Sequence, residues 1–165
     1  MVSAATRFLA IASAFGLAAS LVAYLASFFG VTLESSFKYA FVLHIGFFAL
    51  LSPMFATERS GIRDRSFFWS GFAQGQPDWA VPTIKALGLF LAINFALFLI
   101  QSHAASPEIR DGQYVLNDHG AILRTITKLE YLRLKGSELR LFASGWMFFY
   151  FVPTAYWWFP RPETR

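Results

Sequence analysis

Residues Phe8–Gly30 read FLAIASAFGLAASLVAYLASFFG, and this run holds no charged side chain. As a helix that rises about 1.5 Å per residue, it is long enough to cross a hydrocarbon core about 30 Å thick. Three more apolar runs follow it, at Phe37–Ala56, Ile84–Gln101 and Leu139–Phe159. We therefore expect an all-α membrane protein, a bundle of four transmembrane helices over residues 8–29, 37–56, 84–101 and 139–159.

Charged residues are scarce in this chain and gather between the apolar runs. They make up 15% of the 165 residues, against about 25% in a typical soluble domain. Four spans leave no room for a separate soluble domain, so residues 1–165 are expected to form one membrane domain. The net charge of +4 fits basic flanks on membrane spans and does not indicate nucleic-acid binding. The absence of cysteine excludes disulfides and thiolate metal ligands.

The connection between the third and fourth runs is the only one with the pattern of a soluble fold. Two β-prone stretches, Tyr114–Leu116 and Ala121–Ile126, flank the turn-forming residues Asn117, Asp118, His119 and Gly120. This pattern is typical of a β-hairpin. We expect an extramembrane hairpin segment over residues 110–136, and its turn is a candidate contact for a protein partner.

A short helix is expected after the hairpin, between the third and fourth spans. Thr127 and Glu130 have the spacing of a helix capping box. The pattern predicts an amphipathic helix that runs to about Lys135. Gly136 and Ser137 either end this helix or let it continue into the fourth span.

Small residues recur every four positions in the first run, at Ala12, Gly16 and Ser20. A row of this kind lets two helices approach closely in lipid, where dispersion rather than water expulsion drives packing. We therefore predict a helix-packing face at these three residues. Its partner is either another helix of this chain or a second copy.

The second connection and the chain ends bear on placement in the membrane. An aromatic stretch over residues 67–72 follows several arginines and is expected to lie in the membrane interface. Lys and Arg near the spans number seven on each side, so their count gives no orientation. Because Arg7 precedes the first span, we expect both termini in the cytoplasm and the hairpin on the opposite side.

A belt of polar side chains is predicted at one depth of the bundle. His44 in the second span and Asn94 in the third lie at similar distances from the same membrane side. Four further residues fall within a turn or two of that level: Ser20, Tyr24, Ser144 and Trp146. Such side chains face the bundle interior and pair. The belt either joins helices, at about 0.6 kcal/mol per hydrogen bond, or forms a pocket for a quinone, a lipid head or a proton.

Cofactor and enzyme motifs give no positive signal. A haem would need two axial histidines, and His103 is mismatched in depth with His44. A metal site would draw on His103, Glu108, Asp111, Asp118 and His119, but these lack any recognised ligand spacing. No nucleophile motif or phosphate-binding glycine loop is present. We expect no cofactor, no metal and a protein that is not an enzyme.

Several short motifs, taken in order, resemble those of small bacterial inner-membrane proteins that have no assigned function. They are Leu43-His44-Ile45-Gly46, Pro77-x-Trp79, Asn94-Phe95, Tyr114-Val115-Leu116-Asn117-x-His119-Gly120 and Trp146-Met147-Phe148-Phe149-Tyr150. The resemblance implies a bacterial inner membrane and a four-helix topology. It assigns no catalytic residue.

Two functions are consistent with these patterns. The first is an accessory, assembly or interaction subunit of a membrane complex or homo-oligomer. Its partners would be the lipid bilayer and a protein, or a second copy, bound through the first helix and residues 102–138. The alternative is a small-molecule module that binds a quinone, a lipid or haem at His44 and Asn94.

Overall fold

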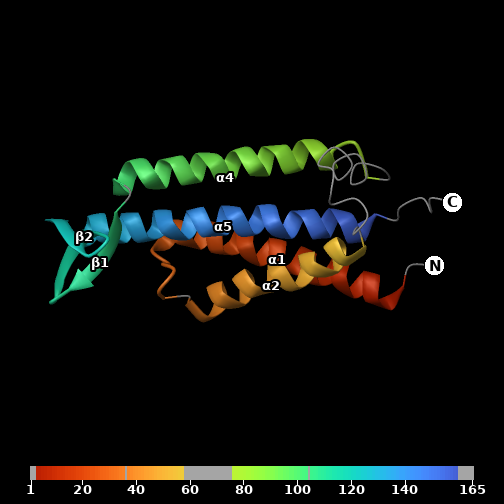
Figure 1. Ribbon diagram of the computed structural model, residues 1–165, viewed down its shortest axis with the longest axis horizontal. Coiled ribbons are helices and arrows are strands. Elements are labelled where there is room, and N and C mark those ends of the chain that lie inside the picture. Colours follow the sequence, from red (N-terminus) through yellow and green to blue (C-terminus); the bar gives the residue numbers. More distant parts are fainter. Residues whose placement is uncertain (1–2, 36, 58–75, 104, 160–165) are drawn as a thin grey trace.

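The computed structural model describes residues 3–35, 37–57, 76–103 and 105–159. This part of the chain forms helices α1 (Ala4–Ala26), α2 (Phe37–Thr57), α4 (Ala80–Ser102) and α5 (Lys128–Trp158). A 3₁₀ turn, η1 (Ser27–Phe29), extends α1. Strands β1 (Ser106–Arg110), β2 (Gln113–Asp118) and β3 (Ala121–Thr125) form a small sheet at the end of the bundle where α5 begins (Figure 1).

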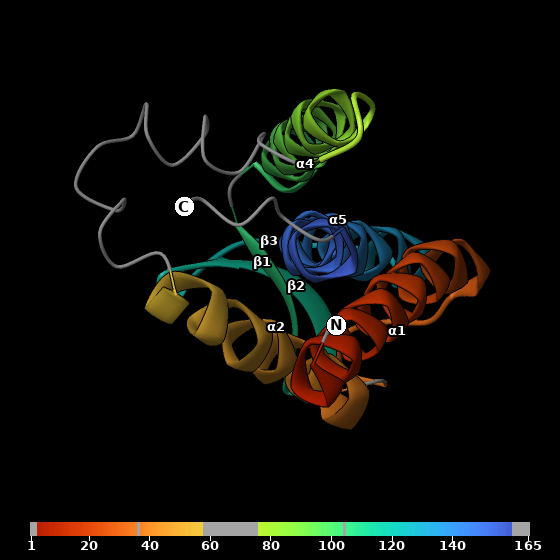
Figure 2. The same ribbon diagram turned by 90° about the vertical axis from the view of Figure 1, so that its right-hand side faces the viewer.

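Helix α5 is the central element of the bundle. Seen along the long axis, it lies between α4 on one side and α1 and α2 on the other (Figure 2). Fifteen of its 31 residues are buried, against four of 23 in α1 and four of 23 in α4. The three other helices therefore pack around α5 and keep most of their own side chains on the outside.

The outer helices are the most apolar ones. Within the described residues, three segments are long and apolar enough to cross a membrane: Ala4–Phe29, Lys38–Ala56 and Ala80–Ser102. Helix α5 is not among them, because its Ser, Gly, Trp, Tyr and Pro residues lower its mean hydropathy. The span expected over residues 139–159 thus stays a prediction. Large apolar side chains such as Phe15, Val42 and Ile100 are at least two-thirds exposed on the outer helices.

Helix α1 presents a seam of small residues to α5. Ser13, Ser20 and Ser27 recur every seven residues and are all buried. Each hydroxyl donates to a backbone carbonyl three or four residues earlier, at 2.6–2.7 Å, so none needs an acceptor on α5. The predicted packing face lies on this side: Gly16 and Ser20 are buried and Ala12 is half-buried.

Tyr150 of α5 fills the space that two glycines leave open. A Cβ atom on Gly16 of α1 or on Gly46 of α2 would collide with the Tyr150 side chain. The Tyr150 hydroxyl also donates to the Leu43 carbonyl of α2 at 2.8 Å. One side chain thereby fixes the spacing of three helices.

The sheet is antiparallel, with β2 between β1 and β3. The predicted hairpin is present as β2 and β3, and its turn residues His119 and Gly120 have φ values of 51° and 98°. Strand β1 was not predicted. It pairs antiparallel with β2, and Asp111 and Gly112 form the turn between the two strands. Their φ values of 51° and 76° suit a two-residue I′ turn.

Of the two alternatives for the helix after the hairpin, the continuous one is observed: residues 128–158 form one helix, and no separate short helix precedes residue 139. Gly136 does not end it, because this glycine serves a close approach. A Cβ there would lie 3.1 Å from the Ser27 carbonyl oxygen of η1. The predicted cap is present, since the Thr127 side chain accepts from the Glu130 N–H at 3.1 Å.

The aromatic stretch expected in the membrane interface, residues 67–72, lies outside the described residues.

Replacing Gly16 with Ala tests the packing around Tyr150. The added methyl displaces the Tyr150 ring, and we expect the free energy of unfolding in detergent to fall by about 1–3 kcal/mol. Gly88→Ala on α4 is the matched control, because its Cβ would lie 3.5 Å from Phe148, at ordinary contact distance. Equal thermal midpoints for Gly16→Ala and Gly88→Ala would contradict this account of the packing.

Candidate functional site

The residues of the predicted polar belt form two separate pairs. The Trp146 indole N–H of α5 donates to Nδ1 of His44 on α2 at 3.3 Å. The Tyr24 hydroxyl of α1 donates to Oδ1 of Asn94 on α4 at 3.5 Å, a long and therefore weak bond. Among the hydrogen bonds of the described residues, none joins His44 to Asn94.

The side chains of Ser20, Ser144 and Asn94 donate hydrogen bonds to backbone carbonyls of their own helices. Ser20 and Ser144 are fully buried, and their hydroxyls donate to the carbonyls of Gly16 and Leu141 at 2.7 and 2.8 Å. The buried Asn94 amide donates to the Phe90 carbonyl of its own helix at 2.9 Å. These three residues therefore offer little to a ligand, and their role is to pack helices.

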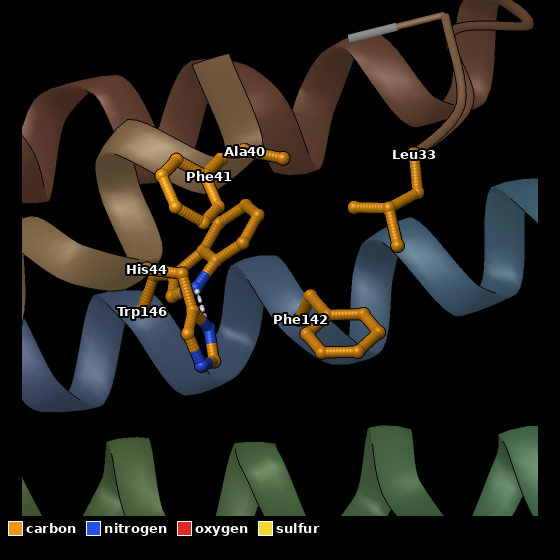
Figure 3. A pocket seen from close by; sticks show the side chains of 6 residues that line it. All are labelled: Leu33, Ala40, Phe41, His44, Phe142 and Trp146. Carbon is orange, nitrogen blue, oxygen red and sulfur yellow. Dashed lines mark hydrogen bonds between the residues drawn. The ribbon is translucent and has the colours of Figure 1, made fainter. Parts of the chain in front are cut away.

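His44 has a different environment, because its side chain is exposed beside a cavity. The cavity has a volume of about 190 Å³. Figure 3 shows its six lining residues, with the His44 ring next to the Trp146 indole: Leu33, Ala40, Phe41, His44, Phe142 and Trp146. The rings of Phe47, Phe48 and Phe142 meet the imidazole edge-on, with centroids 5.3–6.4 Å away.

The bond from Trp146 selects the tautomer of His44. An indole N–H is a donor only, so Nδ1 must be the acceptor. In a neutral imidazole the proton then resides on Nε2. The site therefore combines an N–H donor with an apolar, aromatic cavity wall.

A larger apolar groove lies between α1 and α2. Its volume is about 570 Å³. Its wall is formed by aliphatic and aromatic side chains together with alanines of α1: Phe15, Ala18, Ala19, Val22, Ala23, Val31, Tyr39, Val42, Leu43 and Leu139. With no charged group in this lining, the groove suits an acyl chain or a hydrophobic helix.

The hairpin turn residues stabilise the turn itself. The Asn117 side chain accepts from the Gly120 N–H and donates to Oε2 of Glu108, both at 2.9 Å. Asp118 and His119 contact each other at 3.2 Å at the tip, where the His119 side chain is 95% exposed. Of the four turn residues, Asp118 and His119 are thus the ones available to a partner.

A group of charged residues that the sequence analysis did not single out joins the first connection to α5. Nζ of Lys135 lies 2.8 Å from Oε1 of Glu34 and 3.2 Å from Oε2 of Glu138. The Tyr131 hydroxyl donates to Oε2 of Glu34 at 2.9 Å. No local pattern marks these contacts, because Glu34 is far from the others in the sequence.

The charges of this group shift each other's pKa values. The hydrogen bond from Lys135 holds the pKa of Glu34 below its usual 4.5, although partial burial opposes this. Burial of Lys135 disfavours its charge, but the bonds to Glu34 and Glu138 outweigh burial and raise its pKa above 10.5. Burial and the bond to Glu34 raise the pKa of Tyr131. The lysine is therefore held charged.

Arg140 is a second cation on α5, close to the end of α1. Its guanidinium lies 4.8 Å from the centre of the Phe28 ring and donates to the Ser27 hydroxyl at 3.4 Å. Both partners lie in η1, so Arg140 ties the end of α1 to α5.

The histidines and carboxylates of the third connection do not gather. In the described ranges, no three His, Cys, Asp or Glu side chains lie close enough to hold a metal ion. His103 ends α4 in a left-handed conformation, whereas His119 lies in the turn between β2 and β3.

Comparison with known proteins found no matching family model, no matching curated protein and no matching solved structure. The resemblance to small bacterial membrane proteins therefore has no support beyond the motifs that carry it.

The Glu34–Lys135 pair predicts a window of stability in pH. Since the pKa of Glu34 is lowered, its contribution is present above pH 4.5 and is lost as the pH falls through the lowered value. Since the pKa of Lys135 is raised, its contribution is present below pH 10.5 and is lost as the pH rises beyond that.

Lys135→Met removes the ion pair and should lower the free energy of unfolding inside this window. The expected loss is only about 1 kcal/mol, because Glu34 is more than half exposed and water screens the pair. Thermal unfolding followed by circular dichroism at a series of pH values measures the difference from the unchanged protein. Lys128→Met, at an exposed position of the same helix, is the control. A difference that stays constant to pH 3 would contradict the assignment.

Proposed function

We propose that this chain is an integral protein of a bacterial inner membrane that acts without catalysis, as an accessory or assembly subunit. In this proposal α5 is the fourth span over residues 139–159, both termini are cytoplasmic, and the sheet lies on the other side. The sheet is the surface that meets a protein partner, and the alternative partner is a second copy.

The distribution of polarity supports insertion in lipid. The three most apolar helices carry exposed apolar side chains, while the helix with the most polar residues is enclosed. In water the reverse would be favourable, because exposed apolar area costs about 25 cal/mol per Å². In a bilayer, polar groups are expected to face the bundle interior.

The observation that carries the proposed role is the exposure of β3. All five of its residues are exposed, and Ile122 and Leu123 each keep 52% of their accessible surface. In the part of the chain that the structure describes, β3 is also an edge strand, and one row of its backbone groups has no strand beside it. Such an edge pairs readily with a strand of another protein.

The opposite edge of the sheet is less suited to pairing. Strand β1 contains Pro107, which has no N–H to donate to a partner strand. The charged residues Glu108 and Arg110 follow it. A proline and charged side chains on an edge strand both oppose pairing with a further strand. The two edges therefore differ, and β3 is the one we assign to the partner.

The sheet is held firmly against the bundle. Arg124 of β3 forms an ion pair with Glu130 of α5. Beneath the sheet lies a small core of Ala105, Leu116, Ile126, Tyr131 and Leu134. A fixed sheet with one open edge lowers the ordering cost of binding a partner strand.

A photo-cross-linking residue at position 123, tested in native membranes, checks this role. We expect one protein adduct from Leu123 and none from Ile109, a slightly more exposed position on β1. Ile122→Lys should reduce the adduct several-fold, because a charge on an edge strand opposes pairing. An adduct containing a second copy of the chain would identify the homo-oligomer alternative. Equal labelling from positions 109 and 123, or lipid adducts alone, would overturn the proposal.

A further inference from the structure

We propose that the cavity beside His44 binds a lipid-soluble molecule through one six-membered ring that carries a carbonyl oxygen. The Nε2–H group of His44 donates a hydrogen bond to that oxygen, and the rest of the molecule leaves the cavity toward the lipid. This binding site is separate from the sheet and does not depend on the role proposed above for β3.

The first argument is the state of the imidazole. The Trp146 N–H occupies Nδ1, which leaves the proton of a neutral imidazole on Nε2, and His44 as a residue is exposed. No acceptor for Nε2 is found among the described side chains that surround it, since Phe47, Phe48 and Phe142 offer only ring edges. In hydrocarbon an unpaired donor costs several kcal/mol, so a ligand that brings an acceptor is favoured.

The second argument is the depth of the site. His44 follows the start of α2 at Phe37 by seven residues, which is about 10 Å along the helix. Exposed residues next to it on α2 are apolar, including Phe41, Ile45 and Phe48. The donor therefore lies below the membrane surface, where lipid-soluble molecules reach it more readily than water does.

The third argument is the size of the cavity. Its volume of about 190 Å³ is slightly larger than an apolar cavity of about 150 Å³ that holds benzene. One substituted ring fits this space, whereas a haem is too large. The aromatic side chains of Phe41, Phe142 and Trp146 offer flat surfaces to such a ring (Figure 3).

The sequence analysis expected a site at His44 and Asn94, and the proposed site keeps only His44. Asn94 does not contribute, because it is buried and bonded to Tyr24 and to its own helix. The ligand contacts come from α2, α5 and Leu33 in the first connection. A carbonyl on a flat ring satisfies both the donor and the aromatic wall.

The test uses the full chain in an alkyl maltoside detergent, with ¹⁵N-labelled histidine. Only three histidines are present, so the His44 signals can be assigned by their loss in His44→Leu. The probe is a benzoquinone with a ten-carbon alkyl tail, and the control ligand is benzene with the same tail. We expect the quinone to shift the Nε2 signal of His44 and to saturate, and the alkylbenzene to bind at least tenfold more weakly.

Variants separate binding from folding. His44→Leu should weaken quinone binding at least tenfold, as quenching of tryptophan fluorescence would show. His44→Gln, which retains an N–H donor, should recover most of the affinity. Trp146→Phe keeps an aromatic wall but frees Nδ1, so the imidazole should populate both tautomers and binding should weaken several-fold. Size-exclusion profiles and unchanged His103 and His119 signals verify that each variant is folded.

Four results would overturn the proposal. They are no saturable binding to the unchanged protein, equal binding by His44→Leu, equal binding of the alkylbenzene, and full affinity for Trp146→Phe. A phospholipid that displaces the quinone from the purified protein would overturn it as well, since a lipid ester would then be the natural acceptor.

Discussion

The contact of Tyr150 with two glycines fixes the spacing of the helices on which the rest of the bundle depends. Gly16 and Gly46 lack side chains where the Tyr150 ring passes, so α1 and α2 both approach α5 closely. The Tyr150 hydroxyl is satisfied at the same place by the Leu43 carbonyl. In lipid, where water expulsion does not drive helices together, this kind of close packing is the main attractive term.

The same spacing positions the two surfaces that we connect with function. Because α5 is continuous from Lys128 to Trp158, its first turns extend beyond the packed bundle and carry the sheet. Lys135 and Glu34 hold that end in place. Further along α5, Trp146 meets His44 and sets the proton of the imidazole. The sheet and the cavity are thus both positioned by residues of α5.

The sequence predicts the helices well, because long uncharged runs have few alternatives to a helix. The hairpin at residues 114–126 follows from its turn residues, and the Asp111–Gly112 pair would have predicted β1 by the same rule. Gly136 could not be interpreted alone, because a glycine that ends a helix and one that permits close packing look identical in the sequence.

The polar belt shows the limit of counting along helices. Residue counting gives the depth of His44 and Asn94 but not the direction in which each side chain points around its helix axis. In the structure His44 turns to Trp146 and Asn94 to Tyr24. The link between Glu34 and Lys135 was equally hidden, since it joins distant parts of the chain.

Helix α5 is enclosed by α1, α2 and α4, and in the proposed membrane insertion these three helices face lipid. Because the chain has no cysteine, a single spin label can be placed at Leu89, which is 64% exposed, or at Ala143, which is fully buried. In liposomes the account predicts that the label at 89 collides with oxygen dissolved in the lipid, whereas the label at 143 is shielded from both oxygen and a water-soluble nickel complex. Free access of the nickel complex to position 89, or equal oxygen access at both positions, would contradict it.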